Sequence, residues 1–288
     1  MTSATVTGER GTDLAISPER FRRVSEFITR ELGIRMSDAK IPLLQSRLQR
    51  RVRLAGCASL EDYLHLVLTA GEAHVERLEF IDAVTTNKTD FFREPQHFDF
   101  LRTVALPALD PDAGRPWTCK VWSAGASTGM EAYTLAMVLG EIGAHRGHGF
   151  DFEVLGTDVC RRVLETARAA IYDAADVESV PLELRNKYLL RSRDPGQRQV
   201  RIVPELRTRV RFEPLNFMAA RYAVREVFDA IFFRNVMIYF DKPTQERVVN
   251  LLCEYLRPGG YFFVGHSESV VSLDVPLRTV GSAVYRKR

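Results

Sequence analysis

Residues 120–133 read KVWSAGASTGMEAY, and this stretch decides the fold class. Lys120–Ala124 is strand-like, and Gly125–Gly129 predicts a tight turn. A helix is expected to follow over Met130–Gly140. A buried strand that leads through a short turn into an apolar helix is the unit from which α/β sheets are built.

The same unit recurs further along the chain, with a strand over Phe152–Gly156 and a helix over about Arg161–Ala170. The other expected strands are Val210–Phe212, Phe228–Phe233, Tyr261–Gly265 and Ala283–Arg286, with a helix over Thr244–Leu256. This alternation predicts an α/β fold with a mostly parallel sheet covered on both faces. The last two strands have no helix of ordinary length between them, which predicts an antiparallel strand at the end of the sheet.

Two segments depart from the alternation. Residues 198–203 (RQVRIV) alternate with a period of two, which predicts a small antiparallel β subdomain at about residues 173–209. Residues 106–116 (LPALDPDAGRP) are rich in Pro, Gly and Asp and predict a linker. We therefore expect a linker over residues 101–116 and the α/β domain over residues 117–288.

The part of the chain before the linker has a helical pattern. Ser17 is the expected N-cap of a first helix that begins at Pro18 and ends at Gly33. Apolar residues follow at helical spacing: Phe21, Val24, Phe27, Ile28 and Leu32. Three more helices are expected over about Asp38–Leu54, Leu60–Leu68 and Glu72–Val84. Residues 17–100 are thus predicted to form an all-helical domain, after a disordered tail of residues 1–16.

Composition excludes several classes of protein. The 288 residues carry 40 Lys and Arg against 37 Asp and Glu, a net charge of +3, which argues against a protein that coats nucleic acid. The four cysteines are scattered, and the histidines lack metal-ligand spacing, so neither a disulfide framework nor a metal site is expected. No apolar run approaches the roughly 18 residues that a membrane span needs, and the N-terminal segment lacks an apolar signal core. We therefore expect a cytoplasmic protein that does not insert into a membrane.

The chemistry is expected beyond the carboxyl ends of the strands. The turn at Gly125–Gly129 lets backbone N–H groups approach a ligand, and Asp158, after the second strand, can accept both hydroxyls of a ribose. These features fit either a dinucleotide or S-adenosyl-L-methionine. The glycines do not follow the G-x-G-x-x-G pattern, and the terminal pair of strands is typical of methyltransferases. Both observations favour S-adenosyl-L-methionine.

Four blocks of the sequence resemble a known family, the chemotaxis receptor methyltransferases (CheR). They are TTNKTDFFR (Thr85–Arg93), WSAGASTG (Trp122–Gly129), FFRNVMIYFDK (Phe232–Lys242) and GHSE (Gly265–Glu268). The resemblance extends from about Phe21 to the C-terminus. It implies a Rossmann-like, S-adenosylmethionine-dependent methyltransferase sheet, a small all-helical N-terminal domain and a β subdomain. It also implies methyl transfer from S-adenosyl-L-methionine to glutamate side chains of chemoreceptors, which gives glutamyl methyl esters and S-adenosyl-L-homocysteine.

The resemblance also assigns site residues. Asn87, Thr89 and Arg93 are expected to line the cofactor pocket together with Ala124 and Gly125. Glu131 is expected to bind the methionine amino group and Asp158 the ribose. The adenine edge is assigned to Asn216 and Phe217, and the methionine moiety to Arg234 and Asn235.

Arg93 and Tyr239 are the candidate catalytic residues. A glutamate carboxylate is already ionised near neutral pH, because its reference pKa is about 4.3, so no general base is needed. A guanidinium stays charged and can hold a carboxylate oxygen without protonating it, which makes Arg93 the candidate for orienting the acceptor. Tyr239 is the candidate for shaping the methyl pocket. His266 in the GHSE block is interpreted as part of a structural loop.

A basic helix face predicts the partner. Arg47, Arg50 and Arg53 progress around the face opposite the apolar side of the helix over Asp38–Leu54. Such a face is either simply solvated or a steering surface for an acidic helical bundle. The resemblance favours contact with the cytoplasmic helices of methyl-accepting chemotaxis receptors, and the β subdomain could add a receptor C-terminal peptide to its edge. We expect a monomer.

One departure from the family leaves an alternative open. Many members have two acidic residues after the glycine turn, whereas this chain has Met130 before Glu131. The alternative function is a signalling module of the same fold that binds the cofactor with little activity, or one that modifies a different protein.

Overall fold

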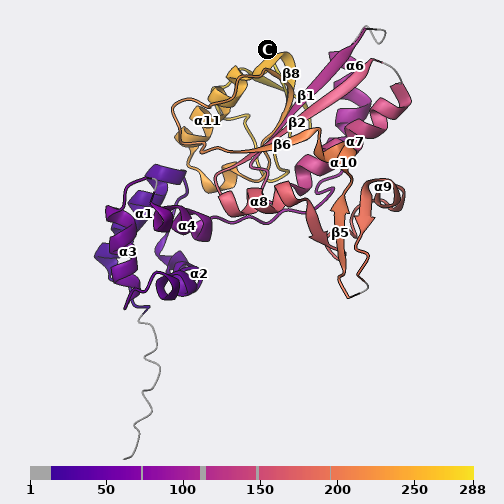
Figure 1. Ribbon diagram of the computed structural model, residues 1–288. Helices are drawn as coiled ribbons and strands as arrows, with labels where there is room; N and C mark the ends of the chain where they lie inside the picture. Colours follow the sequence, from indigo (N-terminus) through magenta and orange to yellow (C-terminus); the bar gives the residue numbers. More distant parts are fainter. Residues whose placement is uncertain (1–13, 73, 111–114, 147–148, 195) are drawn as a thin grey trace, which may run out of the picture. The chain divides into compact units, whose positions relative to one another are not determined.

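The computed structural model describes residues 14–72, 74–110, 115–146, 149–194 and 196–288 (Figure 1). Most of the expected N-terminal tail, residues 1–13, lies outside this description. The chain divides into two compact units, one up to Thr85 and one from Thr86 to Arg288.

The first unit contains the four expected helices. They are α1 (Pro18–Leu32), α2 (Ile41–Leu54), α3 (Leu60–Thr69) and α4 (Val75–Val84). Ser17 Oγ accepts a hydrogen bond from the backbone N–H of Arg20 at 3.2 Å, and Gly33 ends α1 at φ 71°, as the sequence predicts. Helix α4 begins three residues later than expected because His74 is its N-cap.

The second unit is built on a seven-stranded sheet of order β6-β2-β1-β7-β8-β10-β9. The strands are β1 (Trp117–Ala124), β2 (Phe150–Asp158), β6 (Val210–Pro214), β7 (Phe228–Phe232), β8 (Leu256–Phe263), β9 (Leu277–Gly281) and β10 (Val284–Lys287). The first five strands in this order pair in parallel, and β10 pairs antiparallel with both β8 and β9. The mostly parallel α/β sheet with an antiparallel strand near its end is therefore confirmed.

Alternate residues of the strands pack into two separate cores. Val121 of β1 belongs to a cluster with residues of α7 (Met130–Arg146) and α8 (Arg161–Ala169). Trp122, its neighbour, belongs to a second cluster with α11 (Lys242–Glu254). Because successive side chains of a strand point to opposite faces, the sheet is covered on both sides (Figure 1).

The segment expected to be a linker is helical in its first part, which corrects the prediction for residues 101–109. Helix α5 (Gln96–Phe100) continues through a π-helical stretch (η2, Leu101–Ala105) into α6 (Leu106–Leu109). Pro107 lies just after the point where the π-helical stretch passes into α6, and the leucines of this stretch are buried in the same core as Val121. Residues 86–109 thus belong to the second unit, so the division falls at Thr85 rather than near residue 100.

The β subdomain consists of three antiparallel strands in the order β3-β5-β4. They are β3 (Ile171–Asp173), β4 (Leu189–Arg191) and β5 (Gln199–Ile202), accompanied by α9 (Leu182–Tyr188) and α10 (Pro204–Arg207). The expected antiparallel insertion is present, although its first strand starts at Ile171. None of the helices in the described ranges combines the length and apolarity that a membrane span requires.

Candidate functional site

The turn after β1 needs glycine at both ends. Gly125 and Gly129 have φ of 90° and 86°. A Cβ on Gly125 would lie 2.5 Å from Val236 Cγ2, and one on Gly129 would lie 2.8 Å from Ala167 Cβ. The turn therefore brings bare backbone close to the segment that follows β7, as a ligand-binding turn requires.

Asp158, at the end of β2, holds this turn in place. Its Oδ2 accepts from the backbone N–H of Ser127 and its Oδ1 from that of Cys160, both at 2.9 Å. Ser127 Oγ in turn donates to the carbonyl oxygen of Asn87 at 2.7 Å, and Asn87 Nδ2 lies 3.5 Å from Cys160 Sγ. The structure thus brings together Asn87 and Asp158, two residues that the sequence assigns to one pocket.

A buried ion pair joins the segment after β7 to the first turn of α7. Arg234, with a side chain 2% exposed, donates from Nη1 to Glu131 Oε2 at 3.1 Å. Ser123 Oγ donates to the other oxygen of Glu131 at 2.7 Å. Burial raises the pKa of Glu131 above its ordinary value, although Arg234 and Ser123 oppose that rise.

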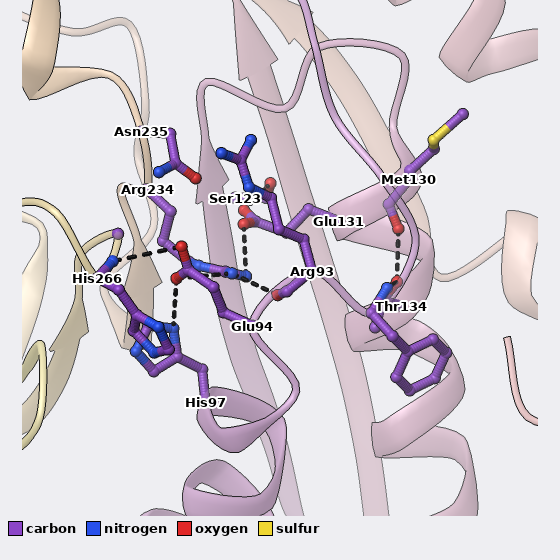
Figure 2. Close-up of polar contacts among 12 residues, drawn as sticks. Arg93, Glu94, His97, Ser123, Met130, Glu131, Thr134, Arg234, Asn235 and His266 are labelled. Carbon is purple, nitrogen blue, oxygen red and sulfur yellow. Dashed lines mark hydrogen bonds and ion pairs between the residues drawn. The ribbon is translucent and has the colours of Figure 1, made fainter. Parts of the chain in front are cut away.

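A second carboxylate contacts the same guanidinium. Arg234 Nη2 donates to Glu94 Oε2 at 3.0 Å, and the backbone N–H of His266 donates to Glu94 Oε1 at 3.3 Å (Figure 2). Burial alone would raise the pKa of Glu94, but Arg234 and the His266 N–H outweigh it and lower the pKa. We call Glu94, Glu131 and Arg234 the Arg234 cluster.

His97 packs beside this cluster. Its ring is 4.9 Å from that of His266 and its Nδ1 is 3.5 Å from Glu94 Oε2. Burial, reinforced by the charge of Arg234, lowers the pKa of His97 to about 4, so the ring is neutral at pH 7. Sequence reasoning missed Glu94 and His97, because nothing in their spacing links them to His266.

Two histidines and a glutamate form a potential metal-ligand set, and their ligand atoms lie within 4.8 Å of one another. The local charge argues against a cation there, because Glu94 already pairs with Arg234 and a divalent ion would lie beside a buried guanidinium.

Arg93 lies on a turn at the edge of the cluster. The backbone carbonyl of Arg93 accepts a hydrogen bond from Arg234 Nη2. Its own Nη1 donates to the carbonyl oxygen of Lys88 at 3.4 Å, and the side chain is half-buried. Thr89, in the same segment, is also half-buried. The structure therefore brings the backbone of Arg93 next to Arg234, two residues that the sequence assigns to one pocket.

The segment after β7 is held by Glu268. Asn235, at φ 60°, donates from its backbone N–H to Glu268 Oε2 at 2.8 Å, and the Gly265 N–H donates to the same oxygen at 2.7 Å. Burial raises the pKa of Glu268, although these backbone N–H groups oppose the rise. The GHSE block is thus a structural loop beside Asn235, as expected. Tyr239, in the short helix Met237–Tyr239, is half-buried against the second core.

Asn216 and Phe217 follow β6. Asn216 Oδ1 accepts from the backbone N–H of Met218 at 2.9 Å, and the Phe217 ring lies 5.0 Å from that of Phe233. Both residues therefore lie beyond the carboxyl end of a strand next to β2.

The three arginines of α2 differ in their surroundings. Arg47 donates from Nη1 to the carbonyl oxygens of Val84 and Thr85, at 2.6 and 3.2 Å, so it caps the end of α4. Arg50 and Arg53 are exposed. The charges of Arg50 and Arg53 are therefore open to solvent, whereas that of Arg47 is used within the first unit.

Comparison with protein families identifies the chain. The model of the CheR methyltransferase SAM-binding domain matches residues 87–286, and that of the CheR methyltransferase all-alpha domain matches residues 19–85. The chain belongs to the CheR methyltransferase family. Both matched ranges agree with the division after Thr85.

Named relatives of this CheR-family chain cover nearly all of it. It is 42% identical to the chemotaxis protein methyltransferase of Klebsiella aerogenes, over 99% of this chain and 97% of that protein. It is 40% identical to chemotaxis protein methyltransferase 2 of Pseudomonas aeruginosa, over 93% and 92%. For the chemotaxis protein methyltransferase of Escherichia coli the identity is 38%, over 94% and 92%.

The described residues fit the cofactor of the CheR family. Arg234 Nε is buried without a hydrogen-bond partner among the residues that the structure describes, so its N–H can donate to an anionic ligand group. Glu131 lies in the first turn of α7, after β1, and Asp158 ends the neighbouring strand β2, so both carboxylates lie at the carboxyl-end edge of the sheet. Met130, where many members have an acid, is buried in the first core and points away from the Arg234 cluster (Figure 2).

Proposed function

We propose that this chain is an S-adenosyl-L-methionine-dependent protein-glutamate O-methyltransferase that acts on chemotaxis receptors. The observation that carries the proposal is the Arg234 cluster, because it places a ligand-ready guanidinium and two carboxylates beside the turn that bears Arg93. The relatives named as chemotaxis protein methyltransferases support the acceptor class.

The cofactor would be held by residues beyond the carboxyl ends of four strands. We assign Glu131 to the methionine amino group, and Arg234 with Asn235 to the rest of the methionine moiety. Asp158 would bind the ribose, and Asn216 with Phe217 the adenine edge. Asn87, Thr89, Ala124 and Gly125 would complete the wall. When bound, S-adenosyl-L-methionine supplies an activated methyl group and leaves as S-adenosyl-L-homocysteine.

The remaining task of the protein is to position the acceptor. A glutamate carboxylate is ionised at neutral pH, because its reference pKa is about 4.3, so no proton has to be removed. Arg93 would hold one carboxylate oxygen and direct the other toward the methyl group, which is catalysis by proximity and orientation. Tyr239 would shape the wall around the methyl group.

The partner would be the cytoplasmic helical region of a chemoreceptor. Exposed Arg50 and Arg53 supply positive charge for an acidic helix, which favours association by electrostatic steering. Strands β3 and β4 are edges of the small sheet, and a pocket of about 350 Å³ adjoins β4. This edge could receive an extended receptor C-terminal peptide. With such a partner, the chain would act in the cytoplasm, as a monomer.

Labelled cofactor tests the proposal. Purified protein should transfer base-labile methyl groups to receptor fragments that carry glutamates, and should bind S-adenosyl-L-homocysteine. Arg93→Ala should reduce turnover much more than cofactor affinity, with Arg102→Ala, an exposed arginine of the π-helical stretch, as the control. Equal loss of both properties would reject the acceptor role of Arg93.

The alternative is a cofactor-binding signalling module with little activity. It was suggested by Met130, but the side chain of Met130 points away from the Arg234 cluster, so its neutrality removes no charge from the site. Tight cofactor binding without transfer to any receptor of the same organism would favour the alternative. Identification of the proteins labelled in a native lysate would show whether the acceptor is a different protein.

A further inference from the structure

The turn that carries Arg93 has an uncommon backbone conformation. Phe92 and Glu94, the residues on either side of Arg93, lie in the left-handed region, at φ 54° and 56°. Residues with a large side chain rarely adopt this region, because the Cβ atom comes close to the carbonyl oxygen. Such a turn persists only where the surrounding structure holds it.

Backbone groups of residues 91–93 each contact a residue from another part of the second unit. The contacts are Ser179 Oγ to the Phe91 carbonyl oxygen at 2.8 Å, the Phe92 N–H to Thr134 Oγ1 at 3.2 Å, and Arg234 Nη2 to the Arg93 carbonyl oxygen. The backbone of the turn that carries Arg93 is therefore held by contacts from outside its own segment.

Glu94 provides the side-chain anchor of the same turn. Its carboxylate, 14% exposed, accepts from Arg234 at 3.0 Å and from the His266 N–H at 3.3 Å, and His97 packs against it (Figure 2). The Nη2 atom of Arg234 that binds Glu94 also binds the Arg93 carbonyl. One guanidinium nitrogen thus joins the side chain of Glu94 to the backbone of Arg93.

We infer that Glu94 is a positioning residue, which fixes the left-handed turn so that Arg93 is directed at the acceptor carboxylate. The inference rests on the proposed function, since it gives Glu94 its role through Arg93. Without Glu94, Arg234 still pairs with Glu131, so the cofactor side of the site keeps its own ion pair. Loss of Glu94 therefore affects the acceptor step more than cofactor binding.

The central test is Glu94→Gln, which keeps the shape of the side chain and removes its charge. Turnover at saturating receptor fragment should fall about 10- to 100-fold, because a displacement of about 1 Å can reduce a rate by about 100-fold. The affinity for S-adenosyl-L-homocysteine, measured by calorimetry, should stay close to the wild-type value. Glu94→Asp, which keeps the charge, should restore part of the turnover.

Asp110→Asn is the matched control. Asp110 is 12% exposed and pairs with a single arginine, Arg146, at 2.7 Å, near the amino end of β1. Asp110→Asn should leave turnover unchanged. Hydrogen exchange of residues 88–95 gives a readout independent of activity, and exchange there should become faster in Glu94→Gln and not in Asp110→Asn.

A double-mutant cycle separates an action through Arg93 from an independent one. In an Arg93→Ala background, Glu94→Gln should change turnover little, because the group that it positions is gone. Losses that multiply, or a cofactor affinity that falls as far as turnover, would overturn the inference. A different result would reject the proposed function itself, namely that the wild-type protein transfers no methyl group to receptors.

Discussion

The side chains of Arg234 and Glu131 form an ion pair with 3.1 Å between Nη1 and Oε2, although one residue follows β7 and the other lies in the first turn of α7. Because β1 and β7 are adjacent and parallel, their carboxyl ends bring these two segments together. The order of the strands in the sheet therefore determines which side chains meet in the Arg234 cluster.

Removal of Arg234 should destabilise the second unit. Arg234→Gln leaves Glu94 and Glu131 buried without their cation, and breaking a buried pair in this way costs about 3–5 kcal/mol. Chemical denaturation should show this loss, and calorimetry should show loss of S-adenosyl-L-homocysteine binding. Arg257→Gln is the control, because it breaks a pair with buried Asp229 and should lower stability without affecting the cofactor. Unchanged cofactor affinity in Arg234→Gln would argue against the assigned role.

The pH dependence of stability should reveal His97. Its pKa of about 4 lies below the unfolded value of about 6.5, so between these values the unfolded chain binds a proton that the native state does not. Stability should therefore rise with pH across this window, by at most about 1.4 kcal/mol per pH unit. The groups that face the ring are Glu94, Arg234 and His266.

Comparison with His97→Gln isolates this effect. Glu94 acts in a lower window, because its lowered pKa gives stability that is present above about pH 4.3 and lost as the pH falls through the folded value. Burial raises the pKa values of Glu131 and Glu268, so their contributions have the opposite sign. These three glutamates are present in both the wild type and His97→Gln, so the difference between the two proteins reports His97. Equal slopes of unfolding free energy between pH 4 and 6.5 in the two proteins would contradict the prediction.

Gly125→Ala should destabilise the turn for two reasons. An alanine at φ 90° is strained by about 1–2 kcal/mol, and its Cβ would lie 2.5 Å from Val236 Cγ2. Thermal unfolding measures the total loss of stability in Gly125→Ala. In the double variant Gly125→Ala/Val236→Ala, only the steric part of that loss should be recovered. Gly149→Ala, at φ 108° with no atom nearer than 3.7 Å, shows the backbone strain alone. A loss equal to that of Gly149→Ala would mean that Val236 moves aside freely.

Local sequence patterns were sufficient to predict the sheet and most helices. Strand Lys120–Ala124 could be predicted because the last four residues of β1 are buried on both faces, and its turn because glycines stand at both ends. The short, exposed strand β9 has no such pattern and was missed.

The linker was mispredicted because Pro107 suggests a break, whereas the chain stays helical through Pro107, from the π-helical stretch into α6. Periodicity also cannot tell which core an apolar residue joins, so Phe98, which stacks on Phe232 of β7 at 5.9 Å, was assigned to the wrong domain. Glu94 and His97 could not be found as a pair with His266, because their contact depends on the register of distant strands.

The two types of arginine on α2 should respond differently to mutation. Exposed Arg50 offers charge to an acidic partner, so Arg50→Glu should weaken receptor affinity, with less effect at high salt because mobile ions screen exposed charges. Arg47 binds the last carbonyls of α4, so Arg47→Ala should lower the stability of the first unit by about 1.5–3 kcal/mol, as expected for hydrogen bonds to a charged group.

Methylation rates against receptor concentration at two salt concentrations, together with thermal unfolding, separate the two effects. Arg23→Glu, the same charge change at an exposed position of α1, is the control. If Arg23→Glu weakened receptor binding as much as Arg50→Glu, the net charge of the protein rather than the α2 face would explain the loss of affinity.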